Sequence, residues 1–153
     1  MRLLSGFLVC ACLCAAPHAK AAQCTLSNTG LHFGTLSSNS ANSAIGMGTV
    51  VLTCRGKTGE RLHYRLRLTA GQGSFQQRIM RSGSDTLSYN LYLDAARTQV
   101  WGDGTNSTGE VSGYLQLPGP VYSRLYPVYA RLSRSAAVRP EAYSDSVAIQ
   151  LEY

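Results

Sequence analysis

The feature that most constrains the fold of this 153-residue chain is an alternating stretch that leads into a glycine-rich turn. Residues 87–94 alternate between apolar and polar positions, as expected for a strand with one buried face. The apolar face holds Leu87, Tyr89, Leu91 and Leu93. Further on, Trp101-Gly102-Asp103-Gly104 contains the only tryptophan, and its glycines and aspartate favour positive φ and a local side-chain hydrogen bond. The stretch therefore predicts a hairpin.

Four other segments also alternate with the period of two that a half-buried strand requires. They are residues 49–54, 62–68, 126–132 and 147–153, with Gly, Ser and Asn clusters between them. Pro127 lacks an N–H donor, so we expect it on an edge strand or at a strand start. No segment of useful length has a helical period. Short strands separated by turn residues predict one all-β sandwich domain.

Short motifs follow one another along the chain over about 130 residues. They are Cys24, Phe33-Gly34, Thr53-Cys54, Arg78-Ile79-Met80, Tyr89-Asn90-Leu91-Tyr92, Trp101-Gly102-Asp103-Gly104 and Tyr143-Ser144-Asp145. In this order they resemble the spore coat protein U domain family, whose members include the pilin subunits of archaic chaperone–usher pili. The resemblance implies structural roles for Phe33, Gly34, Arg78, Met80, Tyr89, Asn90, Tyr92, Trp101, Gly102, Asp103, Gly104, Tyr143 and Asp145.

The first 21 residues have the features of a secretory signal peptide, which leaves residues 22–153 as the mature domain. Arg2 is the basic start, residues 3–16 are the apolar run, and Ala19-Lys20-Ala21 fits the cleavage pattern. A lipoprotein signal around Cys10 and Cys12 is the weaker alternative. No other segment approaches the roughly 20 apolar residues of a membrane helix, so we expect no stable membrane insertion.

Cleavage of this signal would leave two cysteines, Cys24 and Cys54. An even pair in an exported chain predicts one disulfide. Closing a loop of about 30 residues should stabilise the fold by roughly 3–4 kcal/mol. Two cysteines without neighbouring His or Cys do not complete a tetrahedral metal site, so we expect no metal and no other cofactor.

The charge of the chain points to no particular chemistry. Its net charge of +6 becomes +4 without Arg2 and Lys20, and the remaining basic residues are scattered. Arg65 and Arg67 occupy the polar side of one predicted strand, and no nucleic-acid-binding motif accompanies them. Nucleophile, phosphate-loop, dinucleotide and EF-hand motifs are all missing from the sequence. We therefore expect neither an enzyme nor a nucleic-acid-binding protein.

The last alternating segment runs to the final residue, so Tyr153 is expected to be the last core-facing residue. A complete immunoglobulin-like sandwich would usually add another strand. Two alternatives remain: a sandwich of fewer strands that closes unaided, or an incomplete fold filled by a strand from another protein. The family resemblance favours the incomplete fold. The predicted border of the donor-strand groove is Val147, Ile149, Leu151 and Tyr153.

The resemblance implies an exported structural or adhesive subunit of a surface fibre that passes through the periplasm. Its partners would be a periplasmic chaperone, an outer-membrane usher and neighbouring pilin subunits; the receptor is not implied. Only Ala22 and Gln23 would precede Cys24 after cleavage, which is too short for a donor strand. We therefore expect a tip or minor subunit. The alternative is a free-standing secreted or spore-coat protein that does not polymerise.

Overall fold

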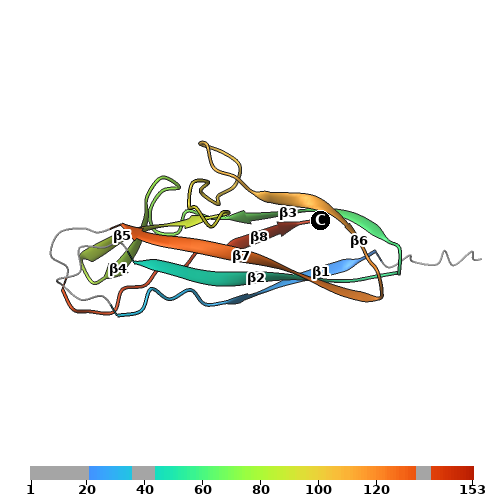
Figure 1. Ribbon diagram of the computed structural model, residues 1–153, viewed down its shortest axis with the longest axis horizontal. Coiled ribbons are helices and arrows are strands. Elements are labelled where there is room, and N and C mark those ends of the chain that lie inside the picture. The colour runs from blue at the N-terminus through green and yellow to red at the C-terminus, as the bar shows by residue number, and fades with distance from the viewer. Residues whose placement is uncertain (1–20, 36–43, 134–138) are drawn as a thin grey trace, which may run out of the picture.

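The computed structural model describes residues 21–35, 44–133 and 139–153, which form eight strands in two antiparallel sheets (Figure 1). The predicted signal peptide lies outside these residues except for its last position, and it stays a prediction. Within the described ranges there is no helix that could cross a membrane. The predicted all-β sandwich is confirmed.

The larger sheet has five strands and the smaller has three, and every pairing is antiparallel. The five-stranded sheet has the order β1 (Gln23–Thr29), β2 (Ile45–Arg55), β7 (Val121–Ser133), β5 (Asp85–Tyr92) and β4 (Arg78–Ser82). The three-stranded sheet has the order β6 (Val111–Gln116), β3 (Arg61–Leu68) and β8 (Ile149–Glu152). Strands β7 and β2 run along the molecule, and β8 lies beside β3 (Figure 1).

The core lies between the sheets, where the alternating positions of facing strands meet. From β2 it receives Val50, Leu52 and Cys54, and from β3 it receives Tyr64, Leu66 and Leu68. Because successive side chains of a strand point to opposite faces, a period of two was sufficient to predict these positions. Trp101 is fully buried although it lies outside the named strands.

Pro127 lies in the middle of β7, which is a central strand, so the predicted strand start is wrong. The pairing of β7 with β5 ends at Tyr129, whereas β2 continues opposite Pro127. At Pro127 the strand therefore has a neighbour on one side only. This local edge can accommodate a residue that has no N–H to donate.

The hairpin predicted after β5 is reduced to a single bridge between Tyr92 and Val100. The chain folds into its own loop first, because the Asp94 carboxylate accepts hydrogen bonds from the backbone N–H groups of Thr98 and Gln99. In the following turn Gly104 has a φ of 84°, and Asn106 and Ser107 also have positive φ.

The two residues before Gly104, Gly102 and Asp103, stabilise the turn through contacts with Thr108 and Thr105. The Asp103 carboxylate accepts the Thr105 backbone N–H at 2.9 Å, which is the predicted local side-chain bond. Gly102 leaves room for Thr108, whose Oγ1 would lie 2.5 Å from an added Cβ. The glycines of this turn therefore serve conformation at one position and close approach at the other.

Candidate functional site

Two strand edges remain unpaired on the same side of the sandwich. Among the described strands, β1 pairs only with β2, and β8 pairs only with β3. The two edges approach each other, with Cα atoms of β1 and β8 within 8 Å. An unpaired edge presents a row of backbone N–H and C=O groups that can pair with another strand.

A groove opens between the sheets near these edges. It consists of a cavity of about 490 Å³ and an adjoining hollow of about 820 Å³. Both are lined by Leu31, His32, Phe33, Met80 and Tyr143. The floor of the first cavity is the core itself, with Val50, Leu68, Leu91 and Val128. The apolar interior is therefore accessible from this side of the sandwich.

The four residues predicted to border a donor-strand groove occupy three different environments. Val147 and Ile149 line the groove and are half-buried. Leu151 is half-buried on β8, opposite Leu66 of β3, and packs against the core. Tyr153 is 57% exposed, so the prediction that it faces the core is wrong in this structure. It lies beyond Glu152, the last β8 residue with a partner on β3.

One wall of the groove is the segment that crosses from the five-stranded sheet to β8. Ser144 exchanges two backbone hydrogen bonds with Arg81 of β4, at 2.9 and 3.1 Å. Further along, the backbone N–H of Thr69 donates to the Ala148 carbonyl at 3.0 Å. The crossing segment is thus fixed to both sheets.

Asp145 fixes the middle of this wall, because its carboxylate accepts the Tyr89 hydroxyl at 2.7 Å. Burial raises the pKa of Tyr89, and the hydrogen bond to Asp145 raises it further. Tyr89 therefore keeps its proton and remains a donor at physiological pH. On the other wall, Phe33 packs edge-to-face on the Tyr89 ring, with centroids 5.9 Å apart. Next to it, Gly34 has a φ of +73°, a conformation that favours glycine.

A second group of motif residues fills the core around the fully buried Arg78, which lies opposite the groove-lining Tyr89 in the β4–β5 register. Its Nη1 donates to Asn90 Oδ1 at 2.6 Å, and its Nη2 donates to the carbonyls of Thr69 and Trp101 at 2.9 and 2.8 Å. Burial lowers the pKa of Arg78, but a guanidinium stays charged in proteins and needs these acceptors. We call Arg78, Asn90 and Trp101 the motif cluster.

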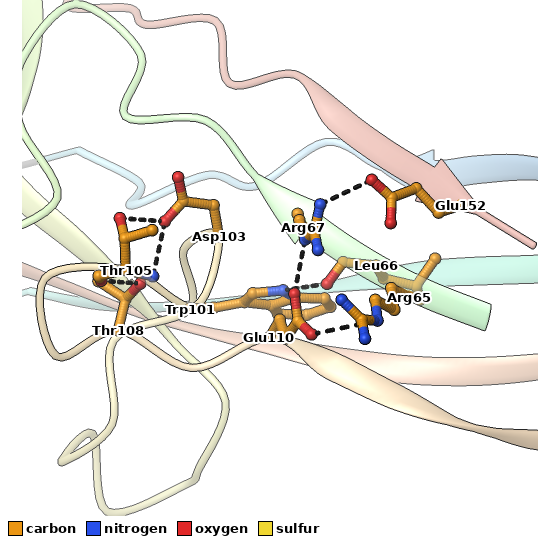
Figure 2. Close-up of polar contacts among 9 residues, drawn as sticks. All are labelled: Arg65, Leu66, Arg67, Trp101, Asp103, Thr105, Thr108, Glu110 and Glu152. Atoms are coloured by element: carbon orange, nitrogen blue, oxygen red, sulfur yellow. Dashed lines mark hydrogen bonds and ion pairs between the residues drawn. The ribbon is translucent and has the colours of Figure 1, made fainter. Parts of the chain in front are cut away.

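Trp101 anchors this cluster to the three-stranded sheet. Its indole Nε1 donates to the Leu66 carbonyl of β3 at 3.2 Å (Figure 2). Sequence reasoning missed the burial of Arg78, because arginine is rarely fully buried and its acceptors here are mostly backbone carbonyls. The motif order was the only signal for this contact.

The remaining motif residues lie outside both groups. The predicted disulfide between Cys24 and Cys54 is confirmed, and it joins directly opposite residues of β1 and β2. Tyr92 lies next to Arg131, whose guanidinium carbon is 5.9 Å from the centre of the tyrosine ring. Asp103 stays within its own turn.

The carboxylates in the two loops after β5 are already bound by their own turns. Hydrogen bonds from Gln99 and Thr98 lower the pKa of Asp94, and hydrogen bonds from Thr105 lower that of Asp103. Among the described residues, no group of three or more His, Cys, Asp or Glu side chains is arranged to hold a metal ion. What the groove offers is apolar surface beside unpaired strand edges.

The family model of the Spore Coat Protein U domain matches residues 10–150. The chain belongs to this family. The resemblance predicted from the motif order is thereby confirmed. No curated protein matches the chain.

A solved structure shares the fold of this Spore Coat Protein U domain. It is a chain in the CsuC–CsuE chaperone–tip adhesion subunit pre-assembly complex from archaic chaperone–usher Csu pili of Acinetobacter baumannii. The two chains are 21% identical with a TM-score of 0.61, and the match covers 87% of this chain. It covers 40% of the other chain, so this protein spans less than half of that chain's length.

Proposed function

We propose that this protein is an exported structural or adhesive subunit of a bacterial surface fibre of the archaic chaperone–usher type, without enzymatic activity. The observation that carries the proposal is the apolar groove beside the unpaired edges of β1 and β8. Family membership and the fold shared with a chain of a chaperone–subunit complex support it. On this proposal the protein passes through the periplasm to the cell surface.

A donated strand would complete the sandwich through two kinds of contact. Its backbone would pair with the free edge of β8, and its alternate side chains would enter the groove beside Val147 and Ile149. A periplasmic chaperone would supply the strand first. At an outer-membrane usher, a neighbouring pilin subunit would then replace it.

Adding a strand to the chain tests this proposal. A segment of alternating apolar residues, fused through a flexible Gly/Ser linker, should raise the thermal midpoint of the exported protein and its soluble yield. The matched control is the same fusion with its apolar residues replaced by serine. A chain that unfolds cooperatively at high temperature without the fusion, and gains nothing from it, would support a free-standing coat protein.

We further propose a tip or minor position in the fibre, because the fold is shared with a chain of a complex that contains a tip adhesion subunit. Immunogold labelling of fibres should then place the protein at fibre ends or at sparse positions. N-terminal sequencing of the mature protein would define any donor segment. Dense labelling along the whole shaft would contradict this position.

A further inference from the structure

The outer face of the five-stranded sheet carries stacked tyrosines and arginines that the fibre proposal does not use. Tyr92 of β5 and Tyr129 of β7 lie directly opposite each other in the register. The guanidinium carbon of Arg131 is 5.9 Å from the centre of the Tyr92 ring, and that of Arg97 is 5.9 Å from the Tyr129 ring. Both distances are in the range of cation–π attraction. We call these four residues the tyrosine–arginine face.

Arg97 is held in place by the loop that follows β5. Its Nε donates to the Ala130 carbonyl at 3.1 Å, and its Nη1 donates to the Ala95 carbonyl at 2.9 Å. Its backbone has a φ of 58°, which is uncommon for a residue other than glycine. These bonds use two of the five guanidinium N–H groups, and the described residues provide no acceptor for the others. A carboxylate could accept two of them side by side.

Apolar side chains extend this face onto β2. Met47 lies opposite Tyr129 and is 64% exposed, and Ile45 lies opposite Arg131 and is 60% exposed. Exposed apolar surface next to partly exposed aromatic rings marks an interaction site more often than isolated apolar residues do. A partner that fits must therefore present both apolar surface and negative charge.

The three-stranded sheet provides a contrast in charge. There Arg67 contacts Glu110 at 2.6 Å and Glu152 at 2.7 Å, and Arg65 lies 3.7 Å from Glu110 (Figure 2). Arg65 and Arg67 are thus compensated by carboxylates of the same sheet and of the loop before β6. Among the described residues, no ion pair involves Arg97 or Arg131. The positive charge of the tyrosine–arginine face is left for a partner.

We propose that the tyrosine–arginine face binds an acidic polysaccharide whose sugars carry carboxylates. The C–H face of a sugar ring can stack on a tyrosine, while the carboxylate at its edge pairs with the neighbouring guanidinium. Two tyrosine–arginine pairs side by side match a polymer that repeats this unit. These residues lie on the outside of the sheet, so the inference does not depend on what fills the groove.

Binding of the exported full-length protein to immobilised polygalacturonate tests this inference. We expect binding that weakens as salt is raised, and about tenfold weaker binding for Arg97→Gln and for Arg131→Gln. Arg61→Gln is the matched control, because it removes the same charge from the three-stranded sheet and should leave binding unchanged. Tyr129→Phe should keep binding and Tyr129→Ala should lose it. An unchanged thermal midpoint would show that each compared variant is folded.

Three further probes separate this partner from others. Neutral dextran tests for sugar stacking alone, polyglutamate for an acidic protein, and phosphatidylglycerol vesicles for a lipid surface. Polygalacturonate should bind more tightly than all three. Equal or tighter binding of any of them, or binding of polygalacturonate that Arg97→Gln and Arg131→Gln leave unchanged, would overturn the proposal.

Discussion

Residues of the same family motifs form both the motif cluster and the groove, but their contacts differ in the two regions. Around Arg78 every contact is internal: the buried guanidinium finds its acceptors on Asn90 and on the carbonyls of Thr69 and Trp101. Around the groove, Met80 and Tyr143 line a cavity whose floor is the core. The motif cluster is satisfied by contacts within the chain, whereas the groove leaves part of the core uncovered.

The difference shows that one sandwich can fix part of its core through internal hydrogen bonds and still leave another part uncovered. A buried charge with satisfied acceptors strongly disfavours alternative arrangements of the chain around it. Asp145 accepts three hydrogen bonds in the wall of the groove, but the apolar side chains that line the cavity have no strand packed over them among the described residues. Substitutions in the motif cluster should therefore be costly in all states of the protein, whereas the cost of those in the groove should depend on what fills it.

The largest effect should come from Trp101→Ala in the motif cluster. Losing a fully buried indole, its hydrogen bond to Leu66 and the packing around it should lower the free energy of unfolding by about 3–5 kcal/mol. Urea unfolding of the strand-fused protein measures this loss. Tyr114→Ala is the control, since Tyr114 is 71% exposed and its loss should change stability far less. Comparable costs for the two variants would refute the contrast.

Cys54→Ala should have the next largest effect, about 3–4 kcal/mol, because the disulfide closes a loop in the unfolded chain. Intact mass before and after reduction should differ by two hydrogen atoms in the wild-type protein, one added to each sulfur. The loss of stability should be similar with the groove empty or filled. Free thiols in the periplasmic protein would show that the bond is not formed there.

Ile149→Ala should have a smaller effect that depends on the state of the groove. Ile149 is half-buried, so truncation should cost about 1 kcal/mol in the chain alone. With a fused donor strand its side chain would be covered on both sides, and the cost should increase. Thermal unfolding of both forms gives the comparison. Equal costs in the two forms would mean that the strand does not pack at Ile149.

The smallest effect should be the pH dependence contributed by Asp103, next to the motif cluster. Its pKa is lowered by hydrogen bonds from Thr105, so the folded state favours the ionised carboxylate. This stabilisation is present above about pH 4, the ordinary range of aspartate, and is lost as the pH falls through the lowered folded value. Thermal midpoints between pH 5 and pH 2 should therefore fall less in Asp103→Asn than in the wild type. Superimposable profiles would show that the turn does not contribute.

Side-chain alternation was sufficient to predict the strands that supply the core, such as the part of β2 that carries Val50 and Leu52. It missed β1, β4 and β6, of which β4 has only five residues. Strand β1 has few apolar residues and forms an edge, and β6 is interrupted by Gly113. The exposure of Tyr153 could not be predicted, because periodicity does not indicate where a strand loses its partner.

The groove was predicted only in part, for a related reason. Its β8 side has a period of two, and Val147 and Ile149 of that alternating segment line the cavity. Its other wall, around Leu31 and Phe33, is irregular backbone with no period to detect. Which irregular segments face each other depends on the complete topology of the chain.

The pairing of β2 with β7 has a consequence for the order of folding. Even the closest partners, Arg55 and Val121, are far apart in sequence, whereas Cys24 and Cys54 lie on a strand pair that needs no later residue. In the proposed export from the N-terminus, β1 and β2 would pair and oxidise early, while the other edge of β2 would stay unpaired until β7 follows. Such distant pairings form slowly, and a waiting edge is prone to aggregation. The chain is therefore most prone to aggregation while β2 is available for pairing and β7 is not.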